Sequence, residues 1–332
     1  MKATDEIMIL RDMVCAGWRT QIIHEGVQSG LFEILSDTPR TVDEIAGESG
    51  LHGPTVFRVL KALSSLSLCK YAPPASFSLT SMGRLLQAGS NQSQRGHALN
   101  WGGRIMETLR TIGQTLQTGE PGFGSGDFNA INSNSKAAEA FNFAMSEQSR
   151  PVARLLATKH DFSGYSMVMD VGGGYGGTLV ELLAAYPDLR GAVYDLPQVE
   201  KGARPYFEKA GVAERASFIG GSFFEAVATG ADCLILKYIL HDWADDECGP
   251  ILDNCRKAME TGQHLLVIER IMPEIPGAEH EDVVRADMVM MPINGKERTL
   301  AEYERFAAAS GFAIRSVEPL LDGCSVMDFE AI

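Results

Sequence analysis

The side chains best suited to chemistry stand at the ends of a series of expected strands. Short apolar runs separated by helical segments predict strands over 167–171, 190–194, 217–219, 233–236 and 264–268. Polar residues occur at or near their ends: Asp170, Asp195, Ser222, Lys237, His241 and Glu269. Parallel strands share one carboxyl edge, where ligands bind at the switch point of the sheet. The pattern therefore predicts a site at this edge.

A glycine-rich turn follows the first of these strands. Residues 167–177 read Met-Val-Met-Asp-Val-Gly-Gly-Gly-Tyr-Gly-Gly and lead into an expected helix over 178–185. Such a turn lets a ligand approach bare backbone at a helix N-terminus. The glycine spacing matches a dinucleotide fingerprint, and Asp195, 18 residues beyond Gly177, suits a ribose diol. The fingerprint alone fits NAD as well as other adenosine ligands.

The surroundings of the turn favour S-adenosylmethionine over NAD. Asp170 precedes the glycines closely, which suits a cationic methionine end better than a pyrophosphate. The turn also lies in mid-chain, and the sheet ends in an expected antiparallel pair near 313–317 and 325–331. A nicotinamide-dependent dehydrogenase is the alternative that this reasoning leaves open.

His241 is the candidate general base. A free phenol has a pKa of ~10 and a histidine ~6.5, so proton transfer between them costs about 5 kcal/mol at ~1.36 per unit. A carboxylate on the far ring nitrogen would lower that cost by stabilising the imidazolium. A histidine at a strand end can also be a purely structural hydrogen-bonding residue. The neighbouring Asp242 could cap a helix opened by Asp242-Trp-Ala-Asp245.

The composition excludes several classes of protein. The 332 residues carry a net charge of −14, which argues against nucleic acid or an anionic membrane as the main partner. No apolar run reaches the ~18 residues of a membrane span, and the first residues lack a signal-peptide layout. The six cysteines form no Cys-x-x-Cys pair, and no metal-ligand spacing occurs. We expect a cytoplasmic protein that holds no metal.

The chain divides into three expected regions: 1–100, 101–160 and 161–332. The first combines helices, a capping box at Thr41–Glu44, a helix from Pro54 and a two-stranded wing over 71–80, which is the layout of a winged helix. A DNA-binding regulator that senses an adenosine ligand is one alternative. However, 53–68 offers only Arg58 and Lys61, and residues 1–90 have 8 basic against 9 acidic side chains, a net of −1. The apolar excess instead favours packing against a second copy.

Several short motifs occur together in a fixed order. They are Asp170-Val-Gly-Gly-Gly174, Asp195-Leu-Pro197, Gly221-Ser-Phe-Phe224, Leu236-Lys-x-x-Leu-His-Asp-Trp243, Glu269 and Gly295-Lys-Glu-Arg-Thr299. In this order and spacing the chain resembles the S-adenosylmethionine-dependent O-methyltransferases, in particular plant caffeate and bacterial antibiotic and phenazine O-methyltransferases. The resemblance covers nearly the whole chain. It implies an α/β fold, with a doubly wound, mostly parallel Rossmann-like sheet and an N-terminal winged-helix dimerisation domain.

The resemblance also implies roles for individual residues. The implied cofactor-binding residues are Asp170, Gly172, Gly173, Gly174, Asp195, Leu196, Gly221, Ser222, Phe223 and Lys237. Among them, Asp195 would hold the ribose hydroxyls and Phe223 would lie against the adenine. Ser222 stands where the family often has an aspartate, so a weaker adenine contact is expected. His241 would be the base, with Glu269 and Glu297 as its carboxylate partners.

The acceptor implied by the resemblance is a phenolic or polycyclic aromatic molecule. Candidate acceptor-binding residues are Trp101, Phe141, Met145, Tyr238, Asp287, Met288 and Met291, and Met13 and Trp18 are candidates for reaching the pocket of a partner subunit. Aromatic and thioether walls suit a flat ring. N-methylation, or a reaction without methyl transfer on the same fold, stays open at this point.

Overall fold

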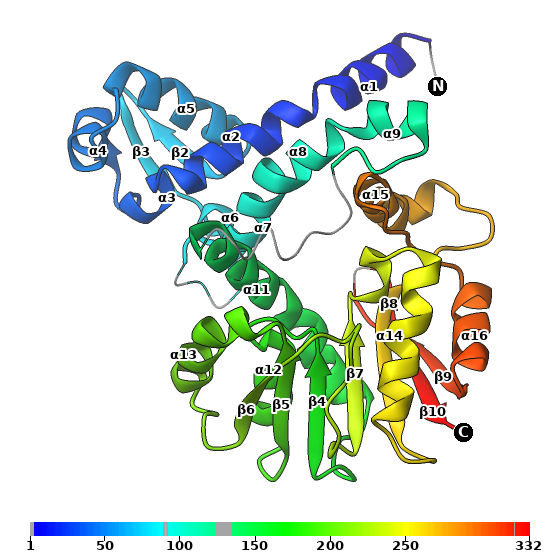
Figure 1. Ribbon diagram of the computed structural model, residues 1–332. Coiled ribbons are helices and arrows are strands. Elements are labelled where there is room, and N and C mark those ends of the chain that lie inside the picture. Colours follow the sequence, from blue (N-terminus) through cyan, green and yellow to red (C-terminus); the bar gives the residue numbers. More distant parts are fainter. Residues whose placement is uncertain (1–2, 89, 91, 124–134, 322) are drawn as a thin grey trace. The chain divides into compact units, whose positions relative to one another are not determined.

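The computed structural model describes residues 3–88, 90, 92–123, 135–321 and 323–332. The chain forms two compact units, Met1–Glu107 and Thr108–Ile332 (Figure 1). Within the described residues, no helix combines the length and the apolar character needed to span a bilayer.

The N-terminal unit is built from short helices around a small sheet. Its helices are α1 (Ala3–Cys15), α2 (Gly17–Gln28), α3 (Leu31–Ile34), α4 (Val42–Ser49), α5 (Gly53–Ser65), α6 (Ser81–Arg84), α7 (Arg95–Asn100) and the π-helical η1 (Trp101–Ile105), followed by α8 (Met106–Leu109) at the unit boundary. Its strands are β1 (Arg40–Thr41), β2 (Cys69–Ala72) and β3 (Ser76–Leu79), in the order β1-β3-β2. The expected capping box is present, since the Thr41 hydroxyl accepts from the N–H of Glu44 and the Glu44 carboxylate accepts from the N–H of Thr41.

The predicted two-stranded wing is present as the antiparallel pair of β2 and β3, and the sheet gains a further strand, β1, that was not predicted. Arg40 and Thr41 pair with Phe77 and Ser76, so the sheet has a third, very short strand. Because Thr41 is the extended residue before the capped helix α4, its backbone is already in the conformation that pairs with β3. A two-residue strand carries no periodicity that a sequence could reveal.

The C-terminal unit contains one seven-stranded sheet. Its strands are β4 (Met167–Val171), β5 (Arg190–Asp195), β6 (Ala216–Gly220), β7 (Cys233–Lys237), β8 (His264–Arg270), β9 (Phe312–Pro319) and β10 (Cys324–Ala331), in the order β6-β5-β4-β7-β8-β10-β9. β4 to β8 are parallel, whereas β10 is antiparallel to both β8 and β9. The predicted mostly parallel sheet with a terminal antiparallel pair is confirmed. Its switch point lies between β4 and β7.

Helices cover both faces of this sheet (Figure 1). The helices on the two faces are α11 (Ser135–Lys159), α12 (Gly177–Ala185), α13 (Glu200–Ala210), α14 (Asp245–Lys257) and α16 (Leu300–Ala309). The unit also contains α9 (Ile112–Thr118), α15 (Glu281–Met290) and the short 3-10 helices η2 (Pro197–Val199), η3 (Leu240–Asp242), η4 (Ala278–His280) and η5 (Met291–Ile293). Side chains of α11, α12 and α13 form one apolar core with the sheet, and those of α14 and α16 form another. The long helix expected over 137–156 falls within α11, whereas most of the loop expected before it lies outside the described residues.

Candidate active site

The glycine turn after β4 needs its glycines for both conformation and space. Gly172, Gly174 and Gly176 have φ values of 75°, 59° and 86°, in the left-handed region that disfavours other residues. A Cβ on Gly172 would lie 2.4 Å from Cδ1 of Ile239, which follows β7. The turn therefore brings bare backbone close to the end of the neighbouring strand at the switch point.

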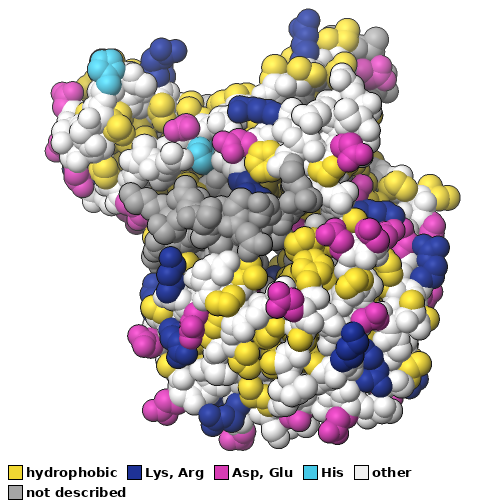
Figure 2. Space-filling view, viewed as in Figure 1, with side chains coloured by type: hydrophobic (Ala, Val, Ile, Leu, Met, Phe, Trp, Pro, Cys, Tyr) yellow, Lys and Arg dark blue, Asp and Glu magenta, His cyan; other side chains and the backbone are white. Residues whose placement is uncertain are grey.

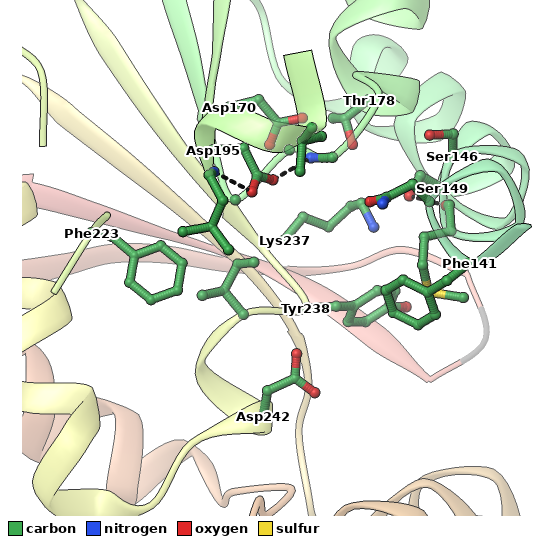
Figure 3. Close-up of a pocket in the computed structure, with 18 of the residues that line it drawn as sticks. Phe141, Ser146, Ser149, Asp170, Thr178, Asp195, Phe223, Lys237, Tyr238 and Asp242 are labelled. Carbon is green, nitrogen blue, oxygen red and sulfur yellow. Dashed lines mark hydrogen bonds between the residues drawn. The ribbon is translucent and has the colours of Figure 1, made fainter. Parts of the chain in front are cut away.

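Asp195, at the end of β5, is fixed by two backbone N–H groups. Its Oδ2 accepts from the N–H of Gly174 at 2.7 Å, and its Oδ1 accepts from the N–H of Leu196 at 2.6 Å (Figure 3). Burial raises the pKa of this carboxyl, and the two hydrogen bonds oppose that rise. Each oxygen keeps a lone pair for a further donor, so the carboxylate is held ready for a diol.

One cavity in this unit collects the whole predicted cofactor set. Of the predicted residues, those that line it are Phe141, Met145, Asp170, Gly172, Gly173, Gly174, Asp195, Leu196, Gly221, Ser222, Phe223, Lys237 and Tyr238. In the view of Figure 3, Tyr238 and Phe223 are seen on different sides of Lys237, and Phe141 is drawn on the same side as Tyr238. The cavity is therefore lined by aromatic side chains as well as by the charged groups of Asp170 and Lys237.

Two buried polar atoms of this cavity have no hydrogen-bond partner among the described residues. They are Oδ2 of Asp170, an acceptor, and Nε2 of Gln148, a donor. Burial raises the pKa of Asp170 to about 7, a rise that Lys237 opposes and Asp195 assists. A zwitterionic amino-acid end presents an ammonium donor and a carboxylate acceptor, which match these two atoms. The residues present therefore fit the methionine end of S-adenosylmethionine.

Sequence reasoning missed the polar side chains that α11 contributes to the cavity. They are Asn142, Ser146, Gln148 and Ser149. Other lining residues that were not predicted come from other elements: Thr178, Val199, Phe224, Ile239, Asp242 and Trp243. Positions 142, 146 and 149 recur at helical spacing and share a face with Met145. This polar stripe between apolar residues was the signal that could have revealed them.

His241 lies in η3, just after β7, and is 7% exposed. Its Nδ1 is 3.0 Å from Oε1 of Glu297, which makes a hydrogen bond, and Oδ1 of Asp242 lies 3.6 Å from Nε2. Burial alone would lower the pKa of the imidazole, but the charges of Glu269, Glu297 and Asp242 outweigh it and raise the pKa to about 9. The site therefore stabilises an imidazolium, as a base that receives a proton requires.

The two glutamates around His241 have different contacts. Oε1 of Glu269 accepts from the N–H groups of Ile239, Leu240 and His241 at 3.0, 2.8 and 3.4 Å. Its other oxygen is 3.7 Å from Nδ1 of the ring, which is beyond hydrogen-bond distance. Glu269 therefore mainly holds the turn, whereas Glu297 holds the ring.

The helix-cap role considered for Asp242 is wrong. Helix α14 begins at Asp245, and its N-cap is Ala244, whose N–H donates to Glu247. Asp242 ends η3 instead, and its carboxylate points into the cavity (Figure 3).

Tyr238 forms a wall beside His241. Its ring stacks on the imidazole with centroids 5.4 Å apart and an interplanar angle of 18°. Nζ of Lys237 and the guanidinium of Arg270 lie 4.4 and 4.8 Å from the same ring centre. Tyr238 has a φ of 54°, which is costly for a residue other than glycine and is typical of functional sites.

The remaining acceptor candidates lie elsewhere. Asp287 in α15 accepts from the N–H of Glu297 at 2.9 Å, so it supports the loop that carries Glu297. Met288 and Met291 are not among the residues that line the cavity. Trp101 belongs to η1 of the N-terminal unit, in which Met13 and Trp18 are 68% and 44% exposed.

Among the described residues, His241, Glu269 and Glu297 also bring their ligand atoms within 4.8 Å of one another, close enough for a metal ion. However, three N–H groups occupy one oxygen of Glu269, and Glu297 is bonded to the ring. The three side chains thus form a buried cluster in which His241 and Glu297 are hydrogen-bonded to each other.

Comparison with known proteins agrees with the chemistry of this site. Residues 110–313 match the family model described as an O-methyltransferase domain. The chain is 32% identical to a phenazine O-methyltransferase from Lysobacter antibioticus, over 98% of this chain and 96% of that one. It is 31% identical to a 3-amino-4-hydroxybenzoate 4-O-methyltransferase from Streptomyces cremeus, over 94% and 86%. A crystal structure of an O-methyltransferase from neocarzinostatin biosynthesis, with S-adenosyl-L-homocysteine and 1,4-dihydroxy-2-naphthoic acid, superposes with a TM-score of 0.77 at 28% identity, covering 95% and 96%.

Proposed function

Since the chain belongs to the O-methyltransferase family, we propose that it methylates a hydroxyl group on an aromatic acceptor, with His241 as general base. The enzyme uses S-adenosylmethionine as methyl donor. The observation that carries the proposal is the hydrogen bond between Nδ1 of His241 and Glu297. Because Glu297 accepts from Nδ1, the single proton of the neutral ring resides there, and Nε2 of that neutral ring has the lone pair that can accept another.

The cofactor site is assigned to the residues around the glycine turn. Asp195 would hold the ribose diol, Asp170 the methionine ammonium, and Gln148 the carboxylate, in keeping with their unused hydrogen-bonding capacity. Phe223 offers an apolar face for the adenine. When bound, S-adenosylmethionine supplies a methyl group already activated on a sulfonium.

The protein's own contribution is to place the acceptor oxygen and take its proton. Phe141, Met145 and Tyr238 provide flat aromatic and thioether surfaces on which an aromatic ring can stack. His241 accepts the hydroxyl proton at Nε2 as the oxygen attacks, and the carboxylate of Glu297 stabilises the resulting imidazolium. Positioning of the two reacting groups accounts for the rest of the rate enhancement.

A panel of acceptors with labelled donor tests this function. We expect methyl label from S-[methyl-¹³C]adenosylmethionine on the oxygen of hydroxylated aromatics such as hydroxynaphthoates, hydroxyphenazines and catechols. Matched arylamines and aliphatic alcohols serve as controls. Mass spectrometry and ¹³C NMR of the product identify the methylated atom. Label on nitrogen alone, or turnover without methyl transfer, would overturn the proposal.

We further propose that the enzyme is a homodimer formed through its N-terminal unit. Helix α1 exposes several apolar side chains to solvent: Leu10, Met13 and Val14 are 62%, 68% and 78% accessible (Figure 2). A helix with so much exposed apolar surface is typical of an interface between subunits.

Charge on α1 should therefore disrupt the dimer. We expect Leu10→Glu together with Val14→Glu to convert a dimer into a monomer, as measured by sedimentation equilibrium. Ile275→Glu, at an apolar residue that is 86% exposed outside α1, is the matched control and should leave the dimer intact. A wild-type monomer at micromolar concentration would contradict this assignment.

A further inference from the structure

Arg298 is a buried charge that the proposed reaction does not use directly. It follows Glu297 in the Gly295–Thr299 motif, is 0% exposed and is the largest fully buried side chain described. Burying a guanidinium is expensive unless every donor is satisfied. What it contacts therefore indicates what it does.

The guanidinium of Arg298 binds the backbone on both sides of His241. Its terminal nitrogens donate to the carbonyl oxygens of Leu240 and Trp243, each at 2.7 Å. Its Nε donates to Oδ1 of Asp245 at 2.9 Å, in the first turn of α14. The fork thus spans the residue before His241 and the second residue after it, and the carboxylate of Asp245 orients it.

These contacts complete a set that holds the His241 turn from both sides. Glu269 accepts from the N–H groups of the turn, and the N–H of Lys296 donates to the carbonyl of His241 at 2.8 Å. Gly295 allows this approach, because a Cβ there would lie 2.2 Å from that same carbonyl oxygen. Arg298 and Glu297 are adjacent in sequence, so one short loop fixes both the ring of His241 and the backbone that carries it.

We propose that Arg298 is a positioning residue for methyl transfer, which keeps His241 in reach of Glu297 by binding the carbonyls of Leu240 and Trp243. The inference rests on the proposed role of His241 as base. A planar fork can bind two carbonyls and a carboxylate together, whereas a lysine ammonium has no fixed geometry of this kind. Small displacements of a base cost rate even when the fold is intact.

The test replaces the fork but keeps the charge. We expect Arg298→Lys to lower kcat about tenfold, to leave the Kd for S-adenosylmethionine unchanged, and to move the NMR-measured pKa of His241 down, because its pairing with Glu297 loosens. The matched control is Arg256→Lys. Arg256 also donates to three backbone carbonyls, of Met259, Gly311 and Ile332, but none of them belongs to the His241 turn. The Arg256→Lys variant should change thermal stability without changing kcat or the pKa of His241.

Each outcome bears on the proposal. If Arg298→Lys only lowers the melting temperature, as the Arg256 control does, or weakens cofactor binding in step with kcat, Arg298 is structural and the proposal fails. If Arg298→Lys does not fold, Asp245→Ala is the second variant. It removes a carboxylate that binds the Arg298 guanidinium, and the side chain it replaces is 59% exposed. We expect about a threefold loss of kcat. An unchanged kcat there overturns the proposal. If His241 itself proves dispensable, the proposed function fails instead, which separates the two.

Discussion

Replacing His241 with alanine is expected to lower kcat by about 10²–10⁴-fold, the range over which general acid–base catalysis accelerates reactions. The loss follows because Nε2 of His241 is assigned to take the acceptor proton, and the Glu297 contact at 3.0 Å exists to stabilise the product of that transfer. Cofactor binding should be retained, since Asp170, Asp195 and the glycine turn are separate residues. Steady-state kinetics with the acceptor found in the panel, and calorimetric titration with S-adenosylmethionine, measure the two quantities.

The chain provides a matched control histidine. His264, at the start of β8, also pairs with a carboxylate, Oδ1 of Asp328 at 2.7 Å. It stands at the amino end of its strand, the opposite end of the parallel sheet from the site. His264→Ala should leave kcat within about twofold of the wild type, in line with substitutions away from a site. Normal turnover in the His241 variant, with cofactor still bound, would show that positioning alone drives methyl transfer.

The pH dependence should change when Glu297 is replaced by glutamine. In the wild type, the pKa of His241 is raised to about 9, so the ring is mostly protonated at lower pH. The rate should therefore rise with pH and level off above about pH 9. Glu297→Gln removes a negative charge 3.0 Å from Nδ1, which favours the neutral ring and lowers its pKa. The rising limb should move to lower pH, while the plateau falls roughly 10²-fold because the imidazolium loses its partner.

The comparison variant for this experiment is Glu302→Gln. Glu302 caps α16 and pairs with Lys296, in the same loop region but without contact to the ring. Its pH profile should superpose on that of the wild type. The profiles are measured as kcat against pH at saturating cofactor and acceptor. If the rising limb of the Glu297→Gln profile does not shift, a group other than His241 controls the pH dependence of kcat.

Much of the catalytic unit could be predicted because its signals are local. Asp170, Asp195 and Lys237 each end or closely follow an apolar run, and parallel strands place such residues at one edge. The glycine turn could be predicted in the same way, since a run of glycines between a strand and a helix is typical of a site where a ligand contacts the backbone. For these positions, sequence and structure agree nearly residue by residue.

Other parts depend on contacts between distant segments, which no periodicity encodes. Glu269 and Glu297 differ in what they bind: Glu269 accepts from backbone N–H groups in and next to η3, whereas Glu297 binds the imidazole ring. Those N–H groups lie 28 to 30 residues before Glu269 in the sequence, so the difference depends on a long-range contact. The strand β1 is too short to show alternation. Asp242 shows a related difficulty, since a capping pattern in sequence predicted a helix start that the chain places at Asp245.

One face of α11 has a consequence for the evolution of new acceptor ranges. Phe141 and Met145, proposed to contact the acceptor, alternate on that face with Asn142, Ser146 and Ser149, which line the same cavity as the residues proposed to bind the methyl donor. Mutations that reshape the acceptor wall on this helix therefore also disturb affinity for the methyl donor. In laboratory selection for new acceptors, substitutions on α11 should therefore change both acceptor range and donor affinity. Compensating substitutions at the serines of α11 should follow each gain in acceptor range.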